Sequence, residues 1–111
     1  MSYSVKTVPH FDREMKRLSK KYVSLKNEYK ELIKELEENP ELGTHLGNDI
    51  YKIRISIASK GKGKRGGARV VTFHKTVHET VYLLSIYDKG EKDTISDNEI
   101  RAIIESEIID Q

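Results

Sequence analysis

The sequence contains no cysteine, which excludes a disulfide framework and thiolate metal sites. It has no apolar run near the ~20 residues that a membrane-spanning helix needs, and its first residues lack the apolar stretch of a signal peptide. We therefore expect a protein of the reducing cytoplasm with no membrane segment. Its 111 residues fit one domain, residues 1–111.

Acidic residues are missing from one long central segment. Residues 50–78 contain eight Lys or Arg residues and no Asp or Glu, although the formal net charge of the whole chain is only +2. Charge separated in this way creates a local positive field, which favours a polyanionic partner. A solvated, lysine-rich loop is the competing interpretation.

The first 40 residues show the pattern of a strand followed by helix. Residues 3–8 are β-branched and alternating, which predicts a short strand, and Pro9 suits the first turn of a helix. Apolar positions then recur at spacings of three and four, as on one helix face. They are Met15, Leu18, Tyr22, Leu25, Tyr29, Leu32 and Leu36. One long helix and a hairpin restarting at Ser24 both fit, and Asn39-Pro40 ends the helical region.

The second half of the chain reads as strands and one helix. Gly43 and Gly47 mark a loop, after which the pattern changes to period two. The expected strands are Asp49–Ala58, Ala68–Lys75 and Thr80–Tyr87. The glycine-rich segment Ser59–Gly67 is a loop, and Ser96 and Glu99 form a capping box before a final helix. This order predicts an α+β fold in which helices cover an antiparallel sheet.

Conventional catalytic and cofactor motifs are absent from the sequence. The four histidines have no zinc-ligand spacing, and no serine sits in a nucleophile elbow. The glycine-rich loop lacks the Gly-Lys-Ser/Thr of a phosphate-binding P-loop and is followed by a strand. We expect no metal and no cofactor.

The basic residues form a more informative pattern. Lys52 and Arg54 share one strand face, roughly 6.6 Å apart along the strand, and Arg69 opens the next strand. The loop between these strands adds Lys60, Lys62, Lys64 and Arg65. If the strands pair, this surface binds phosphates by charge. It can also support RNA cleavage by the substrate's own 2′-hydroxyl, which needs in-line geometry, proton removal and cations at the phosphorus.

Three segments carry a family resemblance. They are Tyr51–Arg54, Ala58–Val71 and Tyr82–Lys89. Together they resemble the HigB-type branch of the RelE/ParE superfamily, the toxins of type II toxin–antitoxin systems. The resemblance covers about Tyr51–Ile104, whereas the first 50 residues match only in element order. It implies a RelE-like fold, in which a small antiparallel or mixed sheet packs against an N-terminal helical hairpin and a C-terminal helix.

The resemblance also implies an activity and partners. Such toxins are ribosome-dependent mRNA endonucleases that enter the ribosomal A site, cut mRNA and inhibit translation. The expected products are a 2′,3′-cyclic phosphate and a 5′-hydroxyl. A cognate antitoxin, expected to be of the helix-turn-helix type, neutralises the toxin, and operator DNA is contacted only through that antitoxin.

The residues that match the family are assigned roles on the same basis. Lys52 or Arg54 is expected to act as the base and to hold the RNA backbone. Arg69 is expected to bind the scissile phosphate, and Lys89 to contact the leaving oxygen. The loop cations Lys60, Lys62, Lys64 and Arg65 are expected to grip RNA. Tyr87 is expected either to stack on a splayed base or to pack at the sheet edge. Ile95 occupies the approximate position of a catalytic tyrosine and Lys89 that of an arginine, so the identity of the base and the acid stays open.

Two other functions fit the same sequence. ParE-like relatives poison DNA gyrase and cut no RNA, but gyrase binding needs no dense Lys/Arg strand face. A non-enzymatic nucleic-acid-binding module would bind RNA without generating new ends. Ribosome-dependent cleavage of mRNA would distinguish the expected endonuclease from both alternatives.

Overall fold

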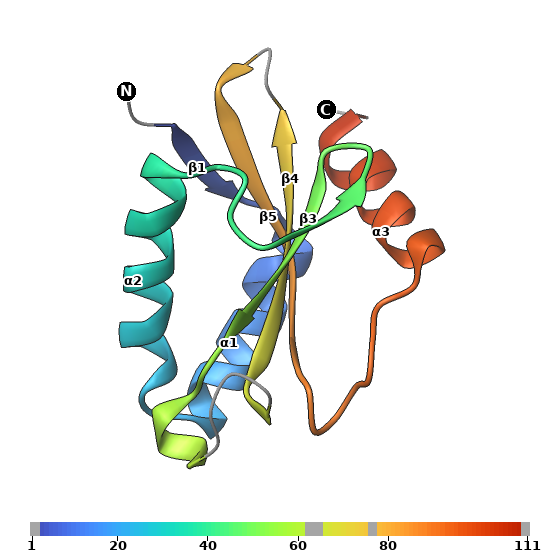
Figure 1. The fold of residues 1–111 in the computed structure, drawn as a ribbon. Helices are drawn as coiled ribbons and strands as arrows, with labels where there is room; N and C mark the ends of the chain where they lie inside the picture. Colours follow the sequence, from blue (N-terminus) through green and yellow to red (C-terminus); the bar gives the residue numbers. More distant parts are fainter. Residues whose placement is uncertain (1–2, 62–65, 76–77, 110–111) are drawn as a thin grey trace.

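The structure, a computed structural model, describes residues 3–61, 66–75 and 78–109. The chain forms β1 (Ser4–Thr7), α1 (Pro9–Lys21), α2 (Leu25–Glu38), β2 (Thr44–Gly47), β3 (Ile50–Ile55), β4 (Ala68–Lys75), β5 (Thr80–Asp88) and α3 (Asp97–Ile104). A 3-10 turn at Ala58–Lys60 follows β3, and a π-helical turn at Glu105–Ile109 continues α3. The strands make one sheet in the order β1-β5-β4-β3-β2 (Figure 1). The expected α+β class is confirmed.

Strands β3, β4 and β5 form an antiparallel meander, whereas β1 pairs with β5 in parallel. Beyond Thr7, α1 runs beside β5 in place of β1. There the Glu14 carboxylate accepts hydrogen bonds from the Ile86 amide (3.1 Å) and the Ser85 hydroxyl (2.8 Å). A side chain of α1 therefore satisfies a strand amide that β1 is too short to reach.

The N-terminal helical region is a hairpin, which settles a question that periodicity left open. Helix α1 ends at Lys21, Tyr22 is extended, and α2 begins at Leu25. The apolar stripe crosses both helices and packs inside the domain, since Leu18 and Leu25 are fully buried. The stripe is therefore core and not a surface for a partner helix.

The expected loop at Gly43 and Gly47 is wrong in part, because Thr44–Gly47 is strand β2. It pairs with the first residues of β3 across a two-residue turn, Asn48-Asp49, in which both residues have positive φ. Such turns match the twist of a hairpin, and Asn and Asp tolerate this conformation. The strand was missed because only four residues form it, and most of them are exposed.

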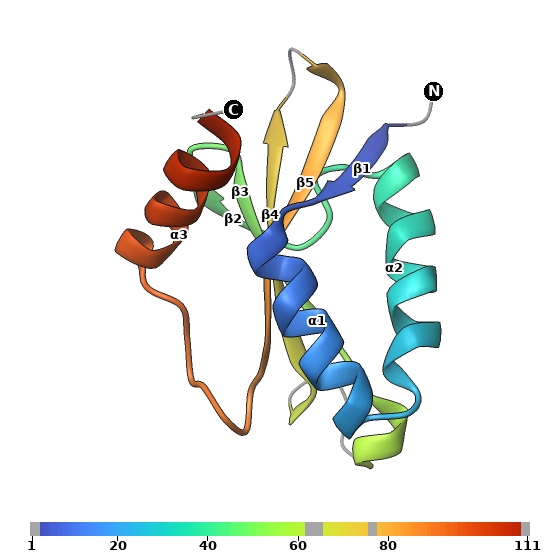
Figure 2. The same cartoon turned by 180° about the vertical axis from the view of Figure 1, so that it is seen from behind.

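The helices lie on two sides of the sheet. Figures 1 and 2 show α1 behind the sheet in one view and in front of it in the other, with α3 beside the strands.

The capping box at the start of α3 is confirmed, because Glu99 donates its amide to the Ser96 hydroxyl at 3.1 Å. Ile100 of α3 faces Ile50 and Phe73 across a cavity of about 340 Å³. Within the described residues, no helix is long and apolar enough to cross a membrane.

Gly67 supports the end of the glycine-rich loop, and we expect Gly67→Ala to destabilise the fold. A Cβ at this position would lie 2.1 Å from the backbone oxygen of Ile55, so backbone must move. We expect a loss of about 1–3 kcal/mol in the free energy of unfolding, typical of overpacking, measured by urea denaturation. Gly61→Asn is the control, because Gly61 has open space around it and a left-handed φ of 77° that Asn tolerates. Equal stability of the two variants would contradict the steric argument.

Candidate functional site

The expected catalytic cations meet on one face of the meander. Arg54 of β3 lies directly opposite Arg69 of β4, and Arg69 lies opposite Tyr87 of β5. Lys52 is two residues from Arg54 on the same face. Residues opposite each other in adjacent strands have Cβ atoms about 4.5–5.5 Å apart. The strand pairing expected from the short connection therefore brings Lys52, Arg54 and Arg69 together.

The two arginines differ in their surroundings. Arg54 is exposed, whereas Arg69 is only 6% exposed and donates a hydrogen bond to the Ala68 carbonyl at 3.2 Å. Like charges directly opposite each other destabilise a sheet. The two guanidinium groups at opposed positions give this face of the sheet a local concentration of positive charge. A buried guanidinium also has fixed donors, which suits recognition of a phosphate.

Lys89 joins this patch through the turn after β5. Its amide donates to the Gly67 carbonyl at 3.0 Å, which ties the residue to the start of β4. Its ammonium group contacts Asp93, at 2.7 Å from both the backbone oxygen and Oδ1. A hydrogen bond from Lys89 and the charge of Lys52 lower the pKa of Asp93 below its ordinary value. One carboxylate thus lies near two of the expected catalytic lysines.

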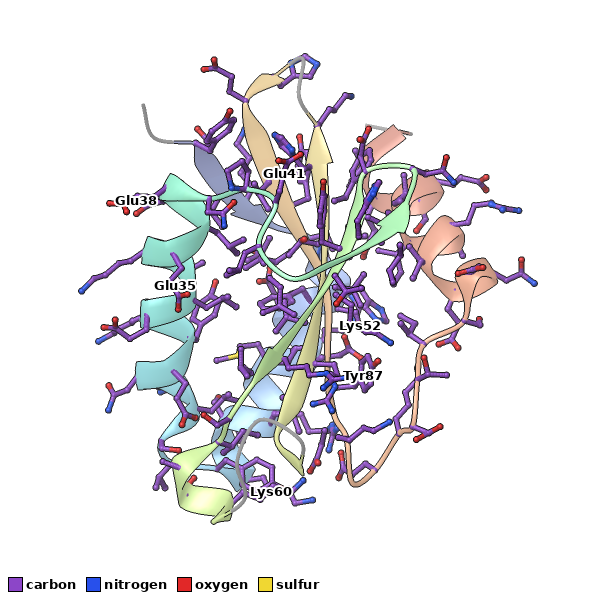
Figure 3. All side chains as sticks on the ribbon, viewed as in Figure 1. Glu35, Glu38, Glu41, Lys52, Lys60 and Tyr87 are labelled. Atoms are coloured by element: carbon purple, nitrogen blue, oxygen red, sulfur yellow. The ribbon has the colours of Figure 1, made fainter. Side chains whose placement is uncertain are left out.

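Tyr87 is packed and does not present an open ring face. It is 3% exposed, and its buried hydroxyl has no hydrogen-bond partner among the residues that the structure describes. The Lys92 ammonium group lies 5.9 Å from the ring centroid. Figure 3 shows Lys52 and Tyr87 on the side of the strands that faces the 89–96 loop. The packing interpretation fits this arrangement, and stacking on a base would require covering groups to move.

Lys60 lies away from the patch, at the lower end of the sheet in Figure 3. Its ammonium group forms an ion pair with Asp88, and its side chain is only 13% exposed. Asp88 also accepts hydrogen bonds from the Tyr22 hydroxyl (2.5 Å) and the Gly90 amide (2.8 Å). The structure thus gives Lys60 a structural contact, where RNA gripping was expected. The other loop cations, Lys62, Lys64 and Arg65, lie outside the described residues.

The contacts of Asp88 predict a pH dependence of stability. Burial raises the pKa of its carboxyl, but hydrogen bonds from Lys60, Tyr22 and Gly90 outweigh burial and lower the pKa from 3.8 to about 2. The unfolded chain therefore binds this proton first as the pH falls. The stabilisation is complete above the unfolded value and is lost between about pH 5 and pH 2, at a cost of about 2 kcal/mol. Chemical denaturation across this range measures it, and a constant free energy of unfolding would contradict the assignment.

The sequence assigned no role to Lys92 and Asp93, which contact Tyr87 and Lys89 of the patch, or to Asp88, which binds Lys60. The sequence offered one signal, the carboxylate of Asp88 at the end of an apolar strand, because a buried carboxylate needs a partner. No three His, Asp or Glu residues within the described ranges come together in a way that could hold a metal ion. The patch can bind a phosphodiester and stabilise negative charge that develops on it.

Several solved structures of bacterial toxins share this architecture. The isolated E. coli RelE toxin superposes with a TM-score of 0.62 at 17% identity, covering 94% of this chain and 98% of that one. The toxin in the intact E. coli RelBE toxin–antitoxin complex gives 0.60 at 19% identity, covering 78% and 96%. The RelBE2 toxin–antitoxin complex from Mycobacterium tuberculosis gives 0.55 at 16% identity, covering 79% and 92%. The chain therefore shares the fold of these structures.

Comparison with protein families shows the family to which the chain belongs. Residues 10–107 match the family described as the RelE toxin of the RelE / RelB toxin-antitoxin system. The chain belongs to the RelE toxin family, and the expected RelE-like fold is confirmed. The match includes both the helical hairpin and the meander that carries the cationic patch.

Proposed function

We propose that this toxin is a ribosome-dependent mRNA endonuclease. The observation that carries the proposal is the opposition of Arg54 and Arg69 on paired strands, with Lys52 on the same face. Lys89 approaches from the following turn. Four cations around one patch match the needs of a reaction in which negative charge grows on a phosphate.

The proposed reaction uses the substrate's own nucleophile. The 2′-oxygen of one nucleotide attacks the adjacent phosphorus while the bond to the 5′-oxygen of the next nucleotide breaks. The products are a 2′,3′-cyclic phosphate and a 5′-hydroxyl, and no metal or protein nucleophile is required. A group on the protein takes the 2′-hydroxyl proton, and the leaving oxygen must gain one.

The residues divide these tasks by their chemistry. A guanidinium stays protonated in proteins, so Lys52 is a better candidate than Arg54 to accept the 2′-hydroxyl proton. Arg69 binds the scissile phosphate, and Arg54 holds the neighbouring backbone. Lys89, freed from Asp93 when RNA binds, supports the leaving oxygen. Tyr87 packs beneath this row.

The proposal extends to partners and to the branch of the family. A cognate antitoxin, expected to carry a helix-turn-helix, neutralises the toxin and connects it to operator DNA. The mRNA is cut in the ribosomal A site, which places the toxin in the cytoplasm. The segments Tyr51–Arg54 and Tyr82–Lys89 resemble those of HigB-type toxins, which supports placing this chain in that branch.

Induced expression with mapping of mRNA ends tests this function against its alternatives. We expect growth arrest and new in-frame mRNA ends with the wild-type chain, and neither with Arg69→Ala. Arrest without new ends would overturn the nuclease and indicate a gyrase-type target. Binding to RNA without arrest or new ends would indicate a non-catalytic binding module.

A further inference from the structure

The turn that carries Lys89 is held in place by the residue before it, Asp88. The Asp88 backbone oxygen accepts hydrogen bonds from the amides of Glu91 and Lys92, both at 2.9 Å, which closes the turn after β5. The Oδ1 atom of its side chain accepts a third, from the Gly90 amide at 2.8 Å. Asp side chains that bond the backbone two residues on are typical of turns. These three bonds fix the backbone on both sides of Lys89.

The Asp88 carboxylate is itself fixed by other segments of the chain. It is only 1% exposed, and it forms an ion pair with the largely buried Lys60 of the 3-10 turn after β3. It also accepts a hydrogen bond at 2.5 Å from the hydroxyl of Tyr22, which lies between α1 and α2. Figures 1 and 2 show these segments at the same end of the molecule. Asp88 therefore connects the helical hairpin and the turn after β3 to the turn that carries Lys89.

The same turn is tied to the strand that carries Arg69. The Lys89 amide donates to the carbonyl of Gly67, two residues before Arg69, at 3.0 Å. The ammonium group of Lys89, in contrast, contacts the carboxylate of Asp93, a side chain that is 93% exposed. Exposed ion pairs contribute little to the placement of either partner. The position of Lys89 relative to Arg69 therefore depends on the backbone of the turn, which Asp88 holds.

We propose that Asp88 is a positioning residue of the cleavage reaction, which places Lys89 beside the leaving oxygen. The inference rests on the proposed function for the role of Lys89. As the 2′-oxygen bonds to phosphorus, the bond to the 5′-oxygen breaks and its electron pair passes to that oxygen, to which the Lys89 ammonium group donates a hydrogen bond. Such stabilisation requires a donor that is in place beforehand. A displacement of about 1 Å, caused by a change away from the reacting groups, can lower the rate about 100-fold.

Three variants separate the position of Lys89 from the stability of the fold. Asp88→Ala removes all of the side-chain contacts of Asp88. Glu14→Ala is the matched control, because Glu14 also bonds a β5 amide, that of Ile86 at 3.1 Å, and its described hydrogen bonds do not reach the turn after β5. Asp88→Asn loses the charge that pairs with Lys60 but keeps an oxygen that can accept from the Gly90 amide. Asn also forms the same kind of turn.

Single-turnover cleavage of two mRNAs on purified ribosomes tests the positioning role. One mRNA is unmodified, and the other carries sulfur in place of the 5′-oxygen at the bond that the wild-type toxin cuts. The sulfur leaves as a thiolate without help from Lys89, because a thiol is a much stronger acid than an alcohol. A defect that lies in the support of the leaving oxygen is therefore relieved on the sulfur mRNA, whereas any other defect remains.

We expect Asp88→Ala to cut the unmodified mRNA about 10- to 100-fold more slowly at saturation, with its half-saturating concentration within about threefold of wild type. On the sulfur mRNA its rate should return to within about threefold of wild type, and Lys89→Gln should show the same recovery. Glu14→Ala and Asp88→Asn should stay within about threefold of wild type on both mRNAs. Arg69→Gln, which acts at the phosphate, should stay slow on both.

Three results would overturn the positioning role. They are wild-type rates in Asp88→Ala, an equal loss on both mRNAs, and an equal loss in Glu14→Ala. Circular dichroism checks the folding of each variant. If Asp88→Ala does not fold, Tyr22→Phe takes its place, since it removes one partner of Asp88 and keeps the ion pair. Its expected loss is smaller, about 3- to 10-fold, with the same recovery on sulfur, and no loss would overturn the inference.

Amide hydrogen exchange of the free toxin, measured by NMR, distinguishes this inference from the proposed function. The Lys89 and Gly90 amides should exchange faster in Asp88→Ala than in wild type, because local opening of the turn becomes easier, and should be unchanged in Glu14→Ala. A wild-type chain that cuts neither mRNA would overturn the nuclease, and with it a role of Asp88 in cleavage. Wild-type cleavage combined with unchanged rates and unchanged exchange in Asp88→Ala would support the nuclease and overturn the positioning role alone.

Discussion

Replacing Arg69 with glutamine is expected to lower the rate of mRNA cleavage on purified ribosomes by about 10²–10³-fold, the loss typical of removing one preorganised donor to a developing anion. Arg69 is buried opposite Arg54, so its guanidinium is held in place before RNA arrives. Arg69→Lys keeps the charge but loses the planar fork, and its rate should fall between those of wild type and Arg69→Gln. Single-turnover primer extension measures all three.

The matched control for Arg69 is Arg101→Gln. Arg101 is an exposed arginine of α3 that lines the cavity beside Ile50 and Phe73, and it takes no part in the proposed reaction. Its rate should stay within about twofold of wild type, consistent with the small effect of most surface substitutions. Folding of each variant is checked by thermal unfolding. A well-folded Arg69→Gln that cuts at the wild-type rate would remove Arg69 from the reaction.

Asp88→Asn is expected to lower the free energy of unfolding by about 2–3 kcal/mol at neutral pH. Breaking a buried ion pair by removing one partner leaves the other charge uncompensated, at a typical cost of 3–5 kcal/mol. We expect a loss below this typical range because water still reaches part of the Lys60 side chain. The variant should also lose the part of the acid dependence that Asp88 supplies. The two free energies of unfolding should therefore converge as the pH falls toward 2.

A double-mutant cycle distinguishes the ion pair from general damage to the fold. Lys60→Met removes the buried charge and keeps an unbranched side chain. Combined with Asp88→Asn, it should cost less than the sum of the two single changes, with a coupling of about 0.5–3 kcal/mol. Urea denaturation of the four proteins gives this value. Strict additivity would show that Lys60 and Asp88 do not stabilise each other.

Local patterns predicted most of the elements because they follow from backbone periodicity and turn chemistry. The limits Ala68–Lys75 of β4 and the capping box at Ser96 were confirmed as expected. The strand expected at Thr80–Tyr87 is β5, which is one residue longer and pairs on both sides. The face shared by Lys52 and Arg54 follows from alternation along β3, and its pairing with Arg69 follows from the short connection.

Contacts between residues far apart in the sequence could not be predicted from these local patterns. The ion pair between Lys60 and Asp88 joins residues 28 positions apart, and no spacing rule selects one carboxylate among many. The same limit applies to the burial of Tyr87, which depends on the path of the following loop.

The parallel pairing of β1 with β5 sets the order in which the molecule can fold. Ser4 pairs with Thr80, so β1 has no partner until β5, the last strand of the sheet in chain order, has been made. Pairings between such distant residues slow folding, because a long loop must close before any contact stabilises it. The proposed site needs β3, β4 and β5 together with Lys89, which follows β5. A nascent chain that stops before β5 therefore lacks Lys89 and the strand that pairs with β4 beside Arg69, and the cationic patch is complete only once β5 and the turn after it have been made.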